Sequence, residues 1–204
     1  LNNDGKEDIF IGGAHKQDAK IFLSNENRLI EKNIESFDID SKNEDMESIF
    51  IDIDNDNDLD LYVVSGGNEF NNRSIELADR IYLNDGKGNF KRDTQEDLQN
   101  YTISGKTVTE IDYDNDGDSD IIIGNRIQTK KYPIHEPSII YENISGKFYN
   151  NTYNIAPEFE NFGIVNKVIK TDFNNDGWDD FIAVGEWTNI CLLYTSPSPR
   201  DETK

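Results

Sequence analysis

The stretch "DIDNDNDLDLYVVSGG", residues 52–67, places five aspartates on alternate residues and follows them directly with an apolar run. Two carboxylates about 5 Å apart repel each other by roughly 3 kcal/mol at an effective dielectric constant of about 20. A folded chain gains nothing from that repulsion unless something neutralises it. The stretch therefore predicts a cation-binding loop immediately before a buried strand.

The same acidic pattern recurs at a fixed interval. It returns as "DYDNDGDSD" from Asp112 and as "DFNNDGWDD" from Asp172, and the chain opens on "LNNDGKED", which lacks the first aspartate. The last aspartates of the four loops are spaced 52, 60 and 60 residues apart, at Asp8, Asp60, Asp120 and Asp180. Such a period is typical of repeat proteins whose units pack against their neighbours.

Short apolar segments flank each acidic loop and predict four strands per repeat. Those before the loops are "SIFI" (48–51), "VTEI" (108–111) and "VIKT" (168–171), and those after are "LYVV" (61–64), "IIIG" (121–124) and "FIAV" (181–184). Each repeat also contains a hairpin pattern, two short strands joined by a polar turn, which starts at Lys20, Arg80 or Ile139. The strands that follow the loops are apolar on successive residues, which favours burial of both of their faces. We therefore predict an all-β fold: a partial β-propeller of about three blades of four-stranded antiparallel sheet, cut from a larger ring. A β-solenoid fits less well, because its repeats are shorter.

The bulk composition is that of an acidic folded protein. The 204 residues carry a net charge of −21 and are 35% hydrophobic, yet they include 11 Phe and 9 Tyr, which disordered acidic chains lack. The charge argues against nucleic acid as a partner and for cations. The single cysteine, Cys191, excludes an internal disulfide, and no apolar run is long enough for a membrane span.

The acidic loops share the pattern D-x-[DN]-x-D-[GN]-x-x-D, with side-chain oxygens at positions 1, 3, 5 and 9 and a backbone carbonyl at position 7. Such ligands suit Ca²⁺ better than Mg²⁺, which requires a strict octahedron. The loops contain no Cys or His, which argues against zinc and copper. Position 6 needs a sharp turn, which glycine supplies in three loops and Asn57 in the second.

Each loop thus gives a candidate ligand set, in which the position-7 residue contributes its carbonyl. The sets are Asn2, Asp4, Lys6 and Asp8; Asp52, Asp54, Asp56, Asp58 and Asp60; Asp112, Asp114, Asp116, Asp118 and Asp120; and Asp172, Asn174, Asp176, Trp178 and Asp180. We expect three full calcium sites and one truncated site, which is weak or empty because the first loop lacks its first ligand. At Asp58 only the carbonyl is expected to matter, so its carboxylate should be replaceable.

An EF-hand and an ordinary turn are the two alternative interpretations of the acidic loops. An EF-hand needs a glutamate at position 12 and flanking helices, whereas position 12 here is Val63, Ile123 or Ala183 between strand-like segments. Asp-Asn-Gly runs are also common as ordinary turns without a metal. Four loops in phase favour the metal interpretation.

The loop "DYDNDGDSDIIIG" and the hairpin "IYLNDGKGNF" resemble the FG-GAP, or VCBS, repeats of integrin α-subunit propellers and their bacterial relatives. The segment "TDFNNDGWDDFIAVGEW" (171–187) resembles more narrowly the secreted ASPIC/UnbV group, which is similar to cartilage acidic protein. The resemblance covers about residues 1–190. It implies a seven-bladed propeller, Ca²⁺ in the loop between the first two strands of a blade, secretion, and a role in binding or adhesion.

The predicted function is an extracellular, periplasmic or cell-surface calcium-binding scaffold with an unknown protein or glycan ligand, and not an enzyme. The alternatives are a Ca²⁺-dependent polysaccharide-active or phospholipase-like enzyme domain and a propeller lectin. His15 and His135 have no partner in a nucleophile motif and are expected to be ordinary surface residues. Residues 1–190 are predicted to form the blades. Residues 191–204 depart from the repeat, resemble translated adaptor sequence, and are expected to be a non-native tail or a linker.

Overall fold

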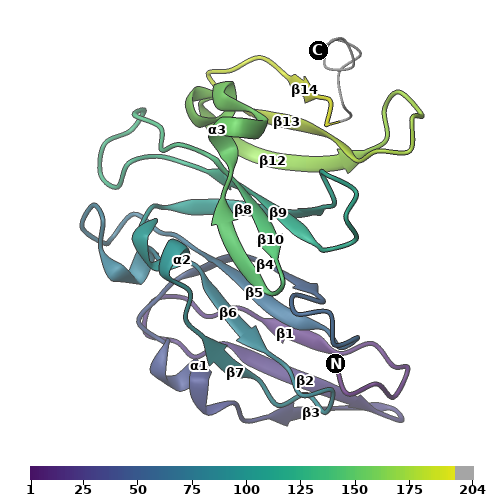
Figure 1. The fold of residues 1–204 in the computed structure, drawn as a ribbon. Helices are drawn as coiled ribbons and strands as arrows, with labels where there is room; N and C mark the ends of the chain where they lie inside the picture. Colours follow the sequence, from purple (N-terminus) through teal and green to yellow (C-terminus); the bar gives the residue numbers. More distant parts are fainter. Residues whose placement is uncertain (196–204) are drawn as a thin grey trace.

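Four antiparallel sheets follow one another in the computed structural model, which describes residues 1–195 (Figure 1). The first two sheets contain β1 (Ile9–Ile11), β2 (Lys20–Asn25) and β3 (Arg28–Lys32), and β4 (Asp45–Ile51), β5 (Asp60–Ser65), β6 (Arg80–Leu83) and β7 (Lys91–Asp93). The last two contain β8 (Gly105–Ile111), β9 (Asp120–Asn125), β10 (Ile139–Ile144) and β11 (Lys147–Asn150), and β12 (Ile164–Thr171), β13 (Asp180–Glu186) and β14 (Cys191–Leu193). The predicted partial propeller is confirmed, with two four-stranded and two three-stranded blades among these residues.

Each blade is a meander in which neighbouring strands in the sequence pair in the sheet. In the second blade β4 pairs with β5 from Asp45↔Ser65 to Ile51↔Asp60, and the third blade repeats this register from Gly105↔Asn125 to Ile111↔Asp120. The acidic loop is therefore the tight connection between the first two strands of a blade. The first strands β4, β8 and β12 also lie against one another, which places them on the inner side of the arc.

The second strand of a blade is buried on both faces, as the apolar runs predicted. All six residues of β5 are buried. Leu61 and Val63 pack in a cluster with Ile21 of the first blade, whereas Tyr62 and Val64 pack in a cluster with Ile121 of the third. Alternate side chains of one strand thus fill two inter-blade cores, so the blades stabilise one another through apolar burial.

Short helices carry the chain from one blade to the next. They are α1 (Glu35–Ile39), α2 (Glu96–Asn100), α3 (Thr152–Ile155) and the 3₁₀ turn η2 (Pro157–Asn161), while η1 (Ile75–Leu77) lies within the β5–β6 connection. Each blade-to-blade connection buries a large apolar residue, such as Phe37, Leu98 or Phe159. None of the described helices is long and apolar enough to cross a membrane.

The predicted boundary at residue 190 stays a prediction. The structure places Cys191–Leu193 as strand β14, paired with β13 through Phe181↔Leu193 and Ala183↔Cys191. Residues 196–204 of the expected tail lie outside the described residues.

Candidate metal centre

The acidic loops occupy equivalent places in successive blades. We call them loop 1 (residues 1–8), loop 2 (52–60), loop 3 (112–120) and loop 4 (172–180). Their positions are numbered 1 to 9 as in the shared pattern, with Leu1 at position 2 of loop 1. Loop 2 joins β4 to β5, loop 3 joins β8 to β9, and loop 4 joins β12 to β13, while loop 1 leads into β1. In loops 2, 3 and 4 the strand pairing on either side fixes both ends of the loop, so these three loops share one geometry.

The aspartates at positions 1 and 5 fold the loop on itself. In loop 3, Asp112 Oδ1 accepts a hydrogen bond from the Asp116 N–H (3.1 Å) and Asp112 Oδ2 accepts one from the Gly117 N–H (3.2 Å). Asp116 Oδ1 in turn accepts from the Asp118 N–H (2.9 Å). Loops 2 and 4 repeat all three bonds, and loop 1 keeps the last of them. These side-chain-to-backbone bonds are local and come directly from the sequence pattern.

Position 4 carries a signal that the sequence pattern treated as variable. It is asparagine in all four loops, and each of these residues has a left-handed backbone: Asn3 (φ 57°), Asn55 (φ 61°), Asn115 (φ 60°) and Asn175 (φ 59°). Asparagine tolerates this conformation better than other residues with a side chain. Position 6 is left-handed as well, as predicted, with φ 68° at Asn57 and φ 94° at Gly117. Two left-handed residues bend the loop so that its carboxylates converge.

The position-9 aspartate is a buried anchor. Asp120 is 1% exposed and accepts hydrogen bonds from the N–H of Tyr113 (3.2 Å) and from the N–H of Asn143 in strand β10 (2.7 Å). Asp60 is also 1% exposed and makes the same two bonds, to the N–H groups of Ile53 (3.0 Å) and Asn84 (2.8 Å). Burial raises the pKa of Asp60 to about 6 and that of Asp120 to about 7. A nearby cation would offset this cost by stabilising the ionised form.

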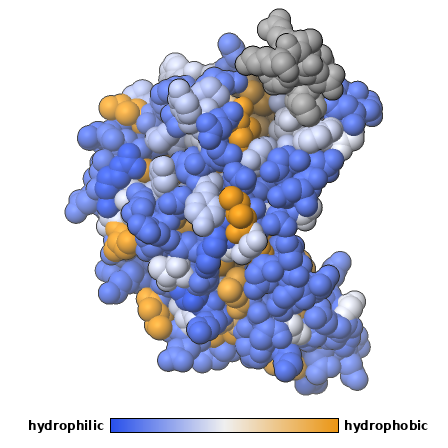
Figure 2. Space-filling model, viewed as in Figure 1, coloured by the Kyte–Doolittle hydropathy of each residue, from blue (hydrophilic) through white to orange (hydrophobic). Residues whose placement is uncertain are grey.

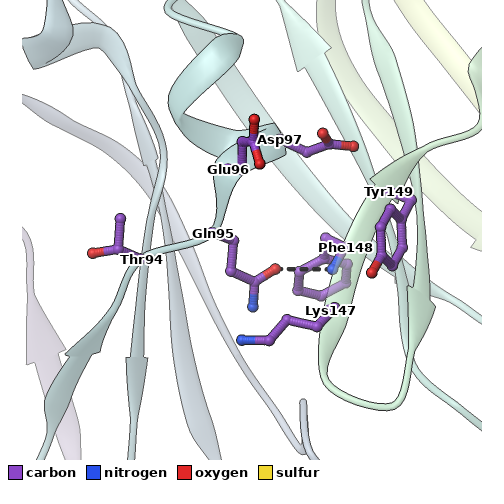
Figure 3. A pocket seen from close by; sticks show the side chains of 7 residues that line it. All are labelled: Thr94, Gln95, Glu96, Asp97, Lys147, Phe148 and Tyr149. Atoms are coloured by element: carbon purple, nitrogen blue, oxygen red, sulfur yellow. Dashed lines mark hydrogen bonds between the residues drawn. The ribbon is translucent and has the colours of Figure 1, made fainter.

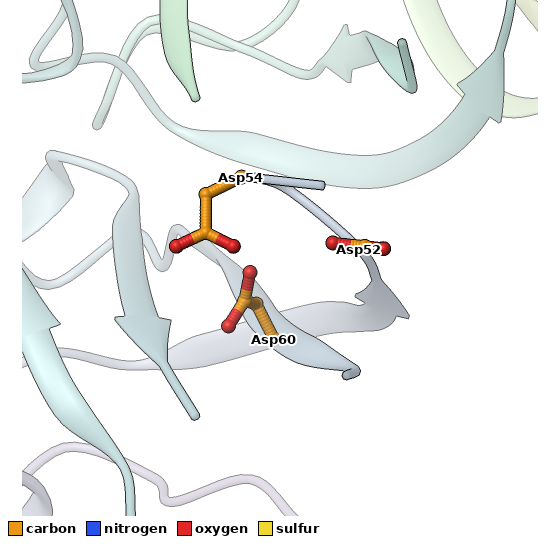
Figure 4. Close-up of side chains that lie close together, drawn as sticks. All are labelled: Asp52, Asp54 and Asp60. Atoms are coloured by element: carbon orange, nitrogen blue, oxygen red, sulfur yellow. The ribbon is translucent and has the colours of Figure 1, made fainter. Parts of the chain in front are cut away.

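Carboxylate oxygens gather most closely in loops 2 and 3. Asp52, Asp54 and Asp60 each offer an oxygen within 4.8 Å of the others, and their side chains point toward a common centre (Figure 4). In loop 3 the group of three is Asp112, Asp114 and Asp116, so the two loops share positions 1 and 3, and the third member is position 9 in loop 2 and position 5 in loop 3. Among the described residues, loop 1 and loop 4 form no such group of three carboxylates. The structure thus brings together three of the predicted side-chain ligands in each of the two central loops, and the full ligand assignment stays a prediction.

Buried oxygens without partners mark the same two loops. Asp114 Oδ1 in loop 3 and Asp58 Oδ1 in loop 2 are buried with no hydrogen-bond partner. Burial, together with the neighbouring carboxylates, raises the pKa of Asp54, Asp58 and Asp114. An unpaired buried carboxylate oxygen is costly, and a hard cation is the natural partner for several such oxygens at once. The donor set therefore fits calcium.

The side chain of Asp58 is buried, and the expectation that its carboxylate is replaceable stays a prediction. Its side chain is only 6% exposed, and a Cβ added at Gly86 would lie 3.4 Å from Asp58 Oδ2. The equivalent Asp118 accepts a hydrogen bond from Asn55 of the preceding blade (2.5 Å). The position-7 carboxylate therefore lies between its own hairpin and the neighbouring loop, where sequence spacing alone could not place it.

Loops 1 and 4 differ from loops 2 and 3 at position 3, where they have asparagine instead of aspartate. Asn174 donates to Asp176 Oδ2 (2.8 Å), and Asn2 donates to Asp4 Oδ2 (3.3 Å). Lys6 also places its ammonium 3.9 Å from Asp4 Oδ2. Each of these contacts occupies a carboxylate oxygen with a protein donor, whereas the corresponding oxygens of loops 2 and 3 stay available to a cation.

A family model described as FG-GAP-like repeat matches residues 1–63 and, in a second match, residues 52–123. Together the two matches cover more than half of the chain. The chain belongs to the FG-GAP-like repeat family. Each match runs from one acidic loop through the next, so the family pattern has the same phase as the blades. A search of curated proteins found no match to the chain.

The FG-GAP-like repeats also contact one another outside the loops. A pocket of about 250 Å³ lies where the connection after β7 meets strand β11 (Figure 3). At this pocket Gln95 accepts a hydrogen bond from the Phe148 N–H (2.8 Å) and donates one to the Gly146 carbonyl (2.9 Å). The hairpin of the third blade is thereby held against the second.

Proposed function

We propose that this chain is a calcium-stabilised β-propeller scaffold whose metal is structural and whose task is binding rather than catalysis. The observation that carries the proposal is that loops 2 and 3 each gather three carboxylates within reach of one ion. Each of these loops also buries a carboxylate oxygen without a hydrogen-bond partner, Asp58 Oδ1 in loop 2 and Asp114 Oδ1 in loop 3. One such loop could be an ordinary turn. A converging group of carboxylates in each of two successive blades of an FG-GAP-like repeat chain supports a repeated metal site.

The proposed ligands are those predicted from the sequence. Positions 1, 3, 5 and 9 would supply side-chain oxygens and position 7 its carbonyl, in loops 2, 3 and 4. Bound calcium would supply positive charge that offsets carboxylate repulsion. The protein holds these oxygens in place with the N–H groups of positions 5, 6 and 7, and the position-9 carboxylate ties the loop to the third strand of the blade.

Calcium titration of the chelator-treated chain by calorimetry tests the proposal. A metal that binds only the folded state adds about 2.7 kcal/mol per site at a hundredfold excess over its dissociation constant, so calcium should raise the melting temperature and chelator should lower it. Asp116→Ala should remove one binding event and leave the others. If neither calcium nor chelator changes the melting temperature, the structural-metal proposal is wrong.

We also propose that the scaffold works outside the cell or at its surface, where millimolar calcium can fill sites with dissociation constants of about 10⁻⁴ to 10⁻³ M. The net charge of −21 and the mostly hydrophilic face in Figure 2 support a soluble surface that engages a protein or glycan. The narrower likeness to the secreted ASPIC/UnbV group belongs to this proposal. Expression of the full reading frame with a cell-fractionation assay tests the location, and recovery in the cytoplasm would contradict it.

Glycan binding is a second candidate function, favoured by one exposed aromatic pair. Trp187 is 81% exposed and donates a hydrogen bond from Nε1 to the hydroxyl of Tyr132, which is 59% exposed (3.0 Å). These residues come from the connections after β13 and β9, away from the metal loops. Large exposed aromatic surface marks recognition sites. A glycan array that shows binding by the native chain and none by Trp187→Ala would support this candidate, and an array with no binding would reject it.

A further inference from the structure

The side chain of Asn143 joins two successive metal loops. Its Nδ2 donates to the carbonyl of Ile53, at position 2 of loop 2 (2.9 Å), and to the carbonyl of Ser119, at position 8 of loop 3 (3.2 Å). Its Oδ1 accepts from the Gly146 N–H (2.9 Å), which closes the hairpin between β10 and β11. The residue is 1% exposed, so water does not compete for these bonds.

Asn84 makes the same contacts one blade earlier. Its Nδ2 donates to the carbonyl of Leu1, at position 2 of loop 1 (2.8 Å), and to the carbonyl of Leu59, at position 8 of loop 2 (3.1 Å). Its Oδ1 accepts from the N–H groups of Asp85 (2.9 Å) and Gly88 (3.0 Å). Two independent copies of one arrangement make it a feature of the repeat. We call Asn84 and Asn143 the hairpin asparagines.

The hairpin asparagines complete a continuous hydrogen-bonded path between the anchors of neighbouring loops. Asp60 Oδ2 accepts from the Ile53 N–H, and the Ile53 carbonyl accepts from Asn143. The N–H of Asn143 then donates to Asp120, which also accepts from the Tyr113 N–H. The path therefore connects Asp60, a proposed ligand of loop 2, with Asp120, a proposed ligand of loop 3. Each group along it is hydrogen-bonded to the next.

Close packing leaves this path little freedom. Gly146 has φ +83°, and a Cβ added there would lie 3.2 Å from the Cβ of Asp54, a proposed ligand in the preceding blade. Gln95 holds the same hairpin from the other side through its bonds to Gly146 and Phe148. A shift of loop 2 on ion binding must therefore move the hairpin of the third blade or be resisted by it.

We propose that the hairpin asparagines are positioning residues that couple calcium binding in neighbouring loops, so that an ion in one loop raises the affinity of the next. The inference rests on the proposed function, because it needs ions in the loops. Coupling free energies between protein sites commonly correspond to about 5-fold to 150-fold changes in affinity. We expect an effect of at least about fivefold between loops 2 and 3.

The outer blades provide an internal comparison. Ser24 in the first blade and Thr195 in the fourth take the place of the hairpin asparagines. The backbone N–H of each donates to the position-9 aspartate of its own loop. The side-chain hydroxyl of each donates to the position-8 carbonyl of the same loop. A hydroxyl has one hydrogen to donate, whereas an amide has two. Ser and Thr therefore serve their own loop only, and Asn143→Ser should keep the bond to Ser119 while losing the bond to Ile53.

The test measures terbium bound in loop 3 of the full chain by luminescence that Tyr113 sensitises, with calcium as the competing ion. Asp56→Ala disables loop 2, and we expect it to weaken calcium binding in loop 3 by at least about fivefold in the native background. In the Asn143→Ser background the same substitution should change the loop 3 affinity less than about twofold. Tyr113→Phe should abolish the luminescence and so shows that the signal comes from loop 3. The matched control is Asn55→Gly, which should preserve the coupling. It removes the exposed contact to Asp118, and glycine permits the left-handed backbone at this position.

The outcomes separate this inference from the proposed function. If loop 3 binds neither terbium nor calcium, the metal proposal fails and the inference fails with it. If loop 3 binds but Asp56→Ala leaves its affinity unchanged, calcium binding stands and the coupling is refuted. If coupling survives Asn143→Ser, the role assigned to Asn143 is refuted.

A second measurement avoids any substitution at Asn143, in case that variant does not fold. Amide hydrogen exchange of Ile53 and Tyr113 reports the two ends of the path. When Asp116→Ala disables loop 3, calcium should protect the Ile53 amide less than it does in the native chain. Equal protection in both proteins would overturn the proposal.

Discussion

Loops 3 and 4 have nearly the same backbone geometry and different side-chain chemistry. The position-1 carboxylate accepts from the N–H groups of positions 5 and 6 at 3.1 and 3.2 Å in loop 3 and at 3.1 and 3.0 Å in loop 4. The position-5 carboxylate accepts from the N–H of position 7 at 2.9 Å in both. At position 3, however, loop 3 has Asp114, with an oxygen that lacks a partner, and loop 4 has Asn174, whose amide donates to Asp176.

This difference separates the residues that hold the turn from the residue at position 3, which the proposed function makes an ion ligand. Aspartates at positions 1 and 5 hold the turn in both loops through backbone N–H groups a few residues away, whichever residue stands at position 3. Ion affinity depends further on how many carboxylates converge without a protein donor. The comparison therefore predicts that loops with one fold differ in affinity, and the following experiments test that prediction.

The largest expected effect concerns the position-9 anchor and needs no metal. Asp120→Ala leaves the buried N–H of Asn143 and the partly buried N–H of Tyr113 without a partner, and a buried donor left unpaired costs about 1–3 kcal/mol. We expect a decrease of about 3 kcal/mol in the free energy of unfolding, measured with urea in excess chelator. Asp180→Ala should cost less, because Asp180 holds the Thr195 N–H at 3.3 Å whereas Asp120 holds the Asn143 N–H at 2.7 Å. A larger loss for Asp180→Ala would contradict the comparison.

Exchanging position 3 between the loops tests the ion-binding half of the comparison. Asn174→Asp should raise the calcium affinity of loop 4, and Asp114→Asn should lower that of loop 3, each by about 2 kcal/mol or roughly thirtyfold, because ligand charge sets affinity. Calorimetry gives both values, and terbium luminescence sensitised by Trp178 identifies loop 4. Neither substitution should change stability in chelator by more than about 0.5 kcal/mol. Affinities that stay equal after the exchange would show that position 3 is not a ligand.

The pKa of the anchor predicts a pH dependence whose sign changes with calcium. In chelator, the folded chain keeps a proton on Asp120 up to about pH 7, whereas an unfolded aspartate releases it near about pH 3.9. Stability from this group is therefore greatest below about pH 4 and is lost as pH rises through about 7. Calcium requires the ionised carboxylate, so its affinity for loop 3 should fall about tenfold per pH unit below about 7, and for loop 2 only below about 6.

Calcium titrations across this pH range check the difference between the two loops. Asp79 provides the control, because burial also raises its pKa to about 7, and it is bonded to the Tyr62 hydroxyl and the Ser65 N–H instead of a loop. Asp79→Asn should flatten the pH dependence of stability in chelator without changing that of calcium binding. If loops 2 and 3 lose affinity at the same pH, the assigned anchors do not control binding.

Much of this molecule could be predicted from the repeat alone. The period located the loops, and the successive apolar residues of β5 and β9 predicted burial on both faces, which the structure confirms. Position 4 was overlooked although its signal is present, because four asparagines in phase mark a left-handed residue as clearly as glycine does. Asn84 and Asn143 lie two residues after Tyr82 and Tyr141, so their phase was visible but their partners were not. Contacts such as Asn143 to Ile53 join residues far apart in the sequence, and spacing within one loop carries no information about them.

The smallest expected effect tests whether position 6 belongs to the turn alone. Asn57 has φ 68°, where its sister loops 3 and 4 have Gly117 at φ 94° and Gly177 at φ 87°. Asn57→Gly should change the free energy of unfolding by less than about 0.5 kcal/mol, whereas Asn57→Ala should cost about 1 kcal/mol, because alanine enters the left-handed region at a steric penalty. Urea unfolding in chelator measures both, and calcium affinity of loop 2 should follow the same order. If alanine is tolerated as well as glycine, the loop relaxes away from its left-handed turn, and the geometry shared by the loops then depends on the ion and not on the backbone.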